Sequence, residues 1–208
     1  PMYILGEITT AIFFGLIAAR GIFINSNILS LEYLITTGFL FIVFSVLLVI
    51  LFYDIRHKII PDELSLSFGV LAFLGLFFFE MTSQGLMFLG WHIPSWEFIT
   101  AGILIPLPFA FLWLISRGRW LGLGDPKLMI GIGLFLGISQ GFSSIFLSFW
   151  IGTLFVIAVG LINLVLKKRL FRDGKKSIMK EELPFAPFLI ISFLVTMVFN
   201  VNFFALFL

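Results

Sequence analysis

Long apolar stretches alternate along this chain with short clusters of charged residues, glycine and proline. Seven stretches are regular enough to predict helices, at residues 4–19, 31–53, 64–79, 98–115, 126–138, 142–166 and 185–208. A helix of roughly 20 apolar residues crosses a hydrocarbon core of about 30 Å. The pattern therefore predicts an all-α fold, a polytopic membrane bundle of about seven transmembrane helices forming one membrane-embedded domain over residues 1–208.

The fifth predicted helix, residues 126–138, is the shortest and contains three glycines, Gly131, Gly133 and Gly137. A helix too short for a full crossing is either tilted in a locally thinned membrane or sheltered inside the bundle. Glycines allow two helix backbones to approach closely. We therefore expect close packing around this segment.

Composition supports a membrane protein and narrows the chemistry. The 208 residues are 61% hydrophobic and 12% charged, which is too little polar surface for a water-soluble globule. The chain has no Cys, which excludes disulfides, thiolate catalysis and Cys-rich zinc sites. Its two histidines, His57 and His92, are too few for a metal cage. Any catalysis is therefore expected to use carboxylates, hydroxyls or the backbone, and we predict no metal.

The basic residues predict an orientation. All of the 13 Lys and Arg residues except Arg20 fall on the side of the loops that follow the second, fourth and sixth predicted helices. An excess of Lys and Arg marks cytoplasmic loops. The N-terminus and the basic run at residues 167–180 are therefore expected in the cytoplasm, where that run contacts anionic lipid, and the C-terminus outside.

Two aspartates lie at helix ends on the predicted cytoplasmic side. Asp54 ends a long apolar run and precedes three basic residues, so by itself it reads as a helix end in the headgroup region. Asp125 precedes Pro126, so by itself it reads as an N-cap. Together, at the same membrane level, the two predict a catalytic pair.

The chemistry of such a pair is peptide hydrolysis. Two carboxyls a few Å apart in a low-dielectric site share one proton. One takes a proton from a water, the water attacks the peptide carbonyl, and the other hydrogen-bonds the developing oxyanion. Gly122 and Gly124 are expected to allow irregular backbone beside Asp125 and a close approach of an extended substrate.

These segments resemble the type IV prepilin peptidases, bacterial GxGD intramembrane aspartyl proteases. The family's Asp followed seven residues later by Pro-Asp matches Asp54 with Pro61-Asp62. Its GxGDxKL signature and trailing glycines match Gly122, Gly124, Asp125, Lys127, Leu128, Gly131 and Gly137. Its late Pro-Phe-Gly-Pro segment appears as Pro184-Phe185-Ala186-Pro187, with Ala186 in place of Gly, and an opening Pro-x-Tyr-x3-Glu as Pro1, Tyr3 and Glu7.

The resemblance implies an endopeptidase of the bacterial inner membrane that cuts the basic leader of type IV prepilins or pseudopilins after Gly, at the cytoplasmic face. Type IV pilus and type II secretion systems use such substrates. The implied catalytic residues are Asp54 and Asp125. Implied substrate-binding or site-shaping residues are Gly122, Gly124, Lys127, Asp62, Glu7 and Pro184. Asp62 is expected to attract cationic leader residues, and Glu7 to face the bundle or the headgroups.

The resemblance also implies cofactors and partners. Proteolysis is expected to need no cofactor. The family methylates the new N-terminus with S-adenosylmethionine, but the family's N-terminal helix and Cys-rich cytoplasmic module are expected to be absent from this chain, so methylation stays open. The expected partners are a prepilin or pseudopilin and membrane lipid, without nucleic acid.

Two other readings remain open at this point. A presenilin or signal-peptide-peptidase-like protease also pairs Tyr-Asp with GxGD, although Pro61-Asp62 and the segment 184–187 favour the prepilin branch. A small proton- or cation-coupled transporter would use the two acids as an ion path. The halves of the chain show no inverted repeat, which disfavours a transporter.

Overall fold

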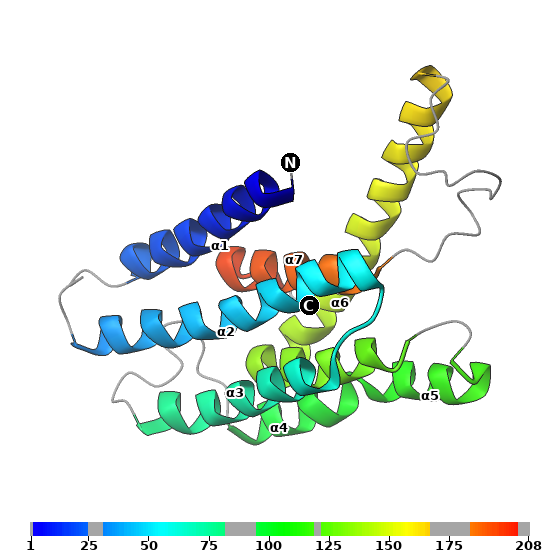
Figure 1. Ribbon diagram of the computed structural model, residues 1–208. Helices are drawn as coiled ribbons and strands as arrows, with labels where there is room; N and C mark the ends of the chain where they lie inside the picture. The colour runs from blue at the N-terminus through cyan, green and yellow to red at the C-terminus, as the bar shows by residue number, and fades with distance from the viewer. Residues whose placement is uncertain (1, 25–30, 82–94, 119–121, 167–183, 204–208) are drawn as a thin grey trace.

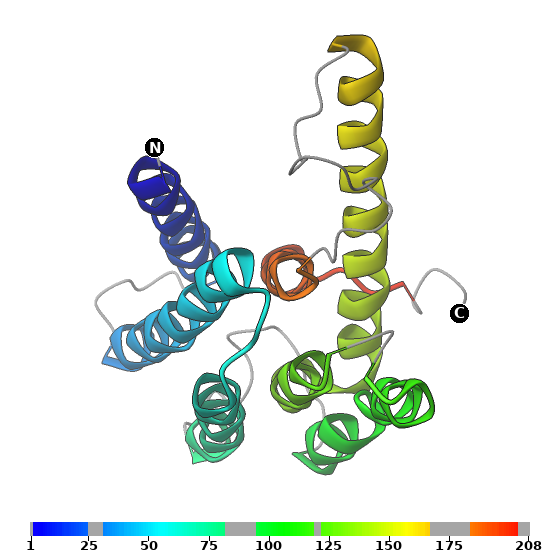
Figure 2. The same cartoon turned by 45° about the vertical axis from the view of Figure 1, so that its right-hand side comes forward.

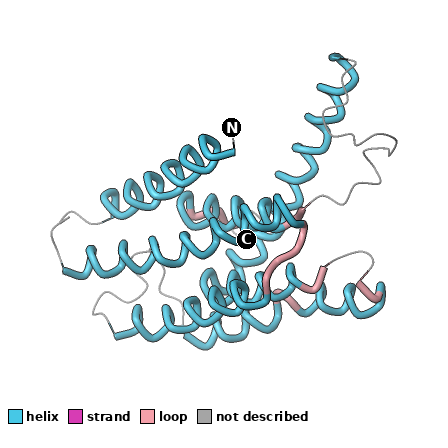
Figure 3. The backbone as a smooth tube through the Cα atoms, viewed as in Figure 1, coloured by secondary structure: helices cyan, strands magenta, loops and turns pink. Residues whose placement is uncertain are grey.

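The computed structural model of the chain describes residues 2–24, 31–81, 95–118, 122–166 and 184–203. Within these ranges every regular element is an α-helix, as Figure 3 shows. The predicted all-α class is therefore confirmed. In chain order the helices are α1 (Met2–Ile24), α2 (Leu31–His57), α3 (Asp62–Met81), α4 (Ser95–Leu104), α5 (Leu107–Ser116), α6 (Gly124–Leu166) and α7 (Ala186–Phe199).

Several of these helices have membrane dimensions. By length and apolar composition, three described stretches are able to cross a membrane: Tyr33–His57, Trp96–Ser116 and Gly124–Ile162. Helix α7 is shorter and also apolar. The predicted polytopic architecture therefore has several membrane-length helices, and the count of seven crossings stays a prediction.

The predicted helix 98–115 is wrong in one respect, because the structure divides it into α4 and α5. The division falls at Ile105 and Pro106. Proline has no backbone N–H and its ring clashes with the preceding turn, so it interrupts the helical hydrogen bonds. Helix α5 then starts with a second proline, Pro108, in its first turn, a position that tolerates it.

The fifth and sixth predicted helices form one continuous element, α6, with a sharp break inside it. Gly137 has φ 76° and ψ −176°, a backbone conformation that is essentially restricted to glycine. The predicted break is therefore real, but no connecting loop separates the two parts. Figure 1 shows the second part, in yellow, leaning away from the other helices.

Helix α7 is shorter than the predicted helix 185–208. It ends at Phe199, and Asn200 follows in the left-handed conformation with φ 58°. A left-handed residue is a common helix terminator, and Asn tolerates it better than most. The end of the predicted helix, residues 204–208, and the basic run 167–180 lie outside the described residues.

Helix α7 occupies the middle of the bundle. Its Phe193 is fully buried, and its ring lies 5.4 Å from Phe44 of α2, 6.0 Å from Phe68 of α3 and 5.4 Å from Phe135 of α6, between ring centroids. Figure 2 shows α7 nearly end-on, with the other helices around it. Packing of these aromatic rings fixes α7 against three helices at once.

The first part of α6 is sheltered and closely packed, as its glycines predict. Residues 131–137 are all buried. A Cβ on Gly131 would overlap the ring of Phe68 in α3, and a Cβ on Gly133 would lie 2.6 Å from the carbonyl oxygen of Ala101 in α4. Glycine is therefore required on both faces of this segment, and α6 is held tightly between α3 and α4.

Candidate active site

Asp54 lies in the last turn of α2 and points into the protein. Its side chain is only 4% exposed, whereas Arg56 and His57 after it are exposed. The turn closes when the backbone N–H of Lys58 donates to the carbonyl oxygen of Asp54 at 2.7 Å, with Lys58 in the left-handed conformation. The helix end therefore directs the acid inward and the basic residues outward.

The start of α7 meets the Asp54 carboxyl. The backbone N–H of Ala186 donates a hydrogen bond to this carboxyl. The first N–H groups of a helix have no partner within it, and they attract a carboxylate. The other oxygen, Oδ2, is buried and has no hydrogen-bond partner in the described part of the chain. Asp54 is thus oriented by one oxygen and leaves the second available.

Asp125 lies in the first turn of α6, beside Asp54. It is 8% exposed, and its carboxyl interacts electrostatically with that of Asp54. Helix α6 begins at Gly124, so Asp125 is inside the helix and not before it. This position does not match an N-cap, which precedes the helix and bonds the next N–H groups. Asp125 is therefore not at the N-cap position of α6, and the catalytic role of the two aspartates stays a prediction.

The two glycines of the signature have different surroundings. Gly122 is exposed, and a Cβ on it would lie 3.8 Å from Oδ2 of Asp125. Its missing side chain leaves the approach to that carboxyl open. A Cβ on Gly124 would lie 2.7 Å from Cβ of Ile60. Gly124 is therefore needed for packing against the α2–α3 connection, a different reason from the expected approach of substrate.

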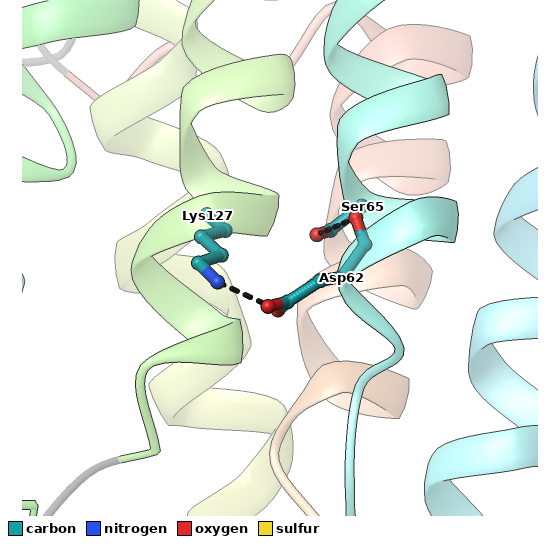
Figure 4. Close-up of polar contacts among 3 residues, drawn as sticks. All are labelled: Asp62, Ser65 and Lys127. Atoms are coloured by element: carbon teal, nitrogen blue, oxygen red, sulfur yellow. Dashed lines mark hydrogen bonds and ion pairs between the residues drawn. The ribbon is translucent and has the colours of Figure 1, made fainter.

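Asp62 and Lys127 meet next to the two aspartates. Asp62 begins α3, Lys127 is in the first turn of α6, and Nζ of Lys127 donates to Oδ1 of Asp62 at 2.6 Å (Figure 4). The Ser65 hydroxyl also donates to the backbone carbonyl of Asp62 at 3.0 Å. The side chain of Asp62 is 73% exposed and that of Lys127 is 33% exposed. The two therefore form an ion pair at the rim of the site.

The remaining predicted residues lie further out. Glu7 is exposed on α1, and no contact with either aspartate is found among the described residues. It therefore does not face the bundle interior, and its expected place at the headgroups stays a prediction. Pro184 lines an apolar groove of about 350 Å³ between the second part of α6 and the start of α7.

Two contributors were not predicted from the sequence. Ala186 acts through its backbone N–H, which no side-chain pattern reveals, although its place in the segment 184–187 was a signal that this region matters. Ile60 is an ordinary apolar residue in sequence, but it is only 9% exposed in a connection between helices. A buried apolar residue in a short loop indicates that the loop packs against a neighbour, here Gly124.

The described residues contain no group of three or more His, Asp or Glu side chains arranged to hold a metal ion. What they do contain is a bundle of apolar helices with two buried, interacting carboxyls at the ends of α2 and α6. These features define a class, a helical membrane protein with a paired-aspartate site.

Comparison with known families identifies the chain more closely. The type IV leader peptidase family matches residues 41–157. The chain therefore belongs to this family, and it is a multi-pass membrane peptidase that acts on a protein substrate. The matched range contains both aspartates and the Asp62–Lys127 ion pair. The predicted family is confirmed, and a transporter is disfavoured. No curated protein and no solved structure matches the chain.

Proposed function

We propose that this chain is an aspartic endopeptidase that removes the leader of type IV prepilins or pseudopilins, with Asp54 and Asp125 as the catalytic pair. One observation carries the proposal. Two buried carboxyls from different helices interact with each other, within the range matched by a leader peptidase family. A buried carboxylate is costly unless it is paired or hydrogen-bonded, so two of them side by side point to a chemical role.

The geometry favours distinct roles for the two acids. The pair shares one proton. Because the N–H of Ala186 stabilises a negative charge on Asp54, we assign Asp54 as the base that takes a proton from the attacking water. Asp125 then holds the shared proton and donates a hydrogen bond to the oxyanion of the peptide carbonyl. The C–N bond then breaks, and Asp54 gives the proton that it took from the water to the leaving amine, which completes hydrolysis.

The open side of the pair suits an extended peptide. Gly122 presents no side chain beside the Asp125 carboxyl, so a substrate backbone is able to reach it. Under the positive-inside rule this end of the bundle faces the cytoplasm, where a basic leader would be cut from the apolar segment that follows it. We propose cleavage after Gly at that face of the inner membrane.

The methyl transfer implied by the family requires a site for S-adenosylmethionine. The groove between α6 and α7 has a suitable size, about 350 Å³, but among the described residues that line it Thr153 is the one with a hydroxyl-bearing side chain. The amino-acid end and the ribose of that molecule need several polar partners. The described lining of this groove therefore does not fit the cofactor.

A direct test is cleavage of a prepilin by the purified chain in detergent, with the products weighed by mass spectrometry. We expect Asp54→Asn and Asp125→Asn each to lower the cleavage rate by at least about 10²–10⁴-fold, because each removes one half of the acid–base pair. Thermal unfolding checks that both variants are folded. A well-folded Asp125→Asn protein that cuts at a near wild-type rate would end the aspartic mechanism. The same assay with S-adenosylmethionine tests for an added methyl group.

A further inference from the structure

The Asp62–Lys127 ion pair joins the starts of α3 and α6. Asp125 lies in α6 itself, and Asp54 lies at the end of α2, just before α3. Lys127 follows Asp125 within the same turn of α6. Asp62 follows Asp54 after a short connection, residues 58–61, that links α2 to α3. Nζ and Oδ1 lie 2.6 Å apart (Figure 4). The ion pair therefore links the two aspartates through the short connection after Asp54 on one side and the first turn of α6 on the other.

Apolar contacts on either side of the ion pair support the same junction. Ile60 packs directly on Gly124, where a Cβ would be only 2.7 Å from Cβ of Ile60. Further along α3, Phe68 packs on Gly131 of α6. The start of α6 thus has little freedom to move along α3. The start of α6 is still able to move away from the start of α3. The ion pair opposes this separation.

Stability alone is a weak explanation for this ion pair. Both side chains reach solvent, 73% for Asp62 and 33% for Lys127, and exposed ion pairs contribute little to folding. Geometry is a stronger explanation, because a catalytic group displaced by about 1 Å loses up to about 10²-fold in rate. The backbone around Asp62 is itself held, since the N–H of Ser65 donates to the carbonyl of Pro61 at 3.1 Å.

We propose that Asp62 and Lys127 are positioning residues whose ion pair sets the spacing of the Asp54 and Asp125 carboxyls. The expected changes in kcat and KM rest on the proposed function, but the effect of the ion pair on the spacing of the two carboxyls does not. It assigns Asp62 and Lys127 to the geometry of the site and not to recognition of the leader.

The kinetic test compares Lys127→Met and Asp62→Asn with Glu63→Gln. Glu63 is a neighbouring exposed acid in the first turn of α3 that makes no ion pair with a described residue, so it controls for loss of charge. We expect kcat to fall by about 2- to 5-fold in the first two variants, with KM nearly unchanged, for basic and neutralised leaders alike, because an exposed ion pair shifts the spacing by no more than its own modest strength allows. Lys127→Arg should restore most of the kcat, because it keeps the charge.

Leader recognition makes the opposite forecast. If Asp62 binds the leader directly, Asp62→Asn should raise KM for the basic leader only, and Lys127→Met should lower that KM by freeing Asp62. Either result would overturn the positioning role.

A second test does not depend on cleavage. The chain has no Cys, so Ile55→Cys and Leu123→Cys introduce two unique, exposed sites for spin labels next to the two aspartates. We expect Lys127→Met to broaden or lengthen the distance distribution between the labels, and Glu63→Gln to leave it unchanged. An unchanged distribution in Lys127→Met would refute the proposal even if the protein proves to have another substrate. Failure of the unaltered protein to cut a prepilin would instead refute the proposed function.

Discussion

Asp54 and Asp125 show how little a single residue reveals about its role. Each has an ordinary explanation in sequence, a helix end at the headgroups for Asp54 and an N-cap for Asp125. In the structure both are buried, at 4% and 8% exposure, and they interact. Burying one carboxylate costs several kcal/mol unless a partner compensates. Burial and pairing together, and neither residue alone, support a catalytic role.

The first residue-scale prediction concerns the double variant Asp54→Asn/Asp125→Asn. We expect its cleavage rate to be about as low as that of either single variant, because groups that act as one unit have non-additive effects. Rates are measured with the same prepilin and detergent. Multiplicative losses in the double variant would mean that the two acids act independently, contrary to the proposed pair.

A further prediction at this scale concerns inhibitors. Cleavage is expected to persist with metal chelators and with thiol- or serine-directed reagents, since the proposed mechanism uses a water activated by two carboxyls. The chain offers no Cys for a thiol reagent to modify. Activity is measured before and after treatment, with a metalloprotease and a serine protease as positive controls. Complete loss with a chelator, reversed by adding metal, would contradict the proposal.

At the scale of elements, the first part of α6 is a rigid support for Asp125. Gly131 packs on α3, and Gly133 and Gly102 lie where α6 and α4 meet. Close helix contacts of this kind stabilise membrane bundles through packing and not through exclusion of water. The helix that presents Asp125 is therefore held on two faces, while the break at Gly137 lets the second part of α6 take a different direction.

The matching prediction compares Gly131→Ala with Gly69→Ala. A Cβ at residue 131 overlaps the Phe68 ring, whereas a Cβ on Gly69 in α3 meets nothing within 4 Å. We expect Gly131→Ala to destabilise the protein by about 1–3 kcal/mol through overpacking. Gly69→Ala should be neutral or stabilise by up to about 1 kcal/mol through helix propensity. Thermal unfolding in one detergent measures both, and equal stability of the two variants would argue against the close contact.

At the scale of the whole molecule, the last turn of α2 and the first turns of α6 and α7 meet around the aspartates, on one side of the bundle. The contacts of Asp54 with Ala186, and of Lys127 with Asp62, show this directly. Phe199, at the end of α7, marks the other end of that helix. The distribution of Lys and Arg predicts that the side with the aspartates faces the cytoplasm.

Cysteine labelling in intact cells tests this orientation. Ile59→Cys lies in the connection between α2 and α3, and Phe199→Cys at the end of α7; both positions are 65% exposed. With a membrane-impermeant maleimide we expect the Phe199→Cys variant to react and the Ile59→Cys variant to react only after the membrane is permeabilised. The unaltered chain has no Cys and serves as the blank. Labelling of the Ile59→Cys variant in intact cells would reverse the predicted topology.

The sequence by itself determined the helical membrane class, the short glycine-lined segment at residues 126–138, the position of both aspartates at helix ends and the family. These follow from local features, namely apolar runs, glycines, charge clusters and motif spacing, which need no knowledge of the fold. The division at Pro106 was not predicted, although a proline inside an apolar run is a local signal for an interrupted helix.

Only the tertiary structure decided which residues complete the site. The N–H of Ala186 reaches Asp54, Ile60 packs on Gly124, and Lys127 pairs with Asp62, although in each case the partners belong to different segments of the chain. Helix α7 lies in the centre because Phe193 packs on rings from α2, α3 and α6. Such contacts depend on how whole helices pack together, and helix periodicity describes each helix alone, so its neighbours appear only in three dimensions.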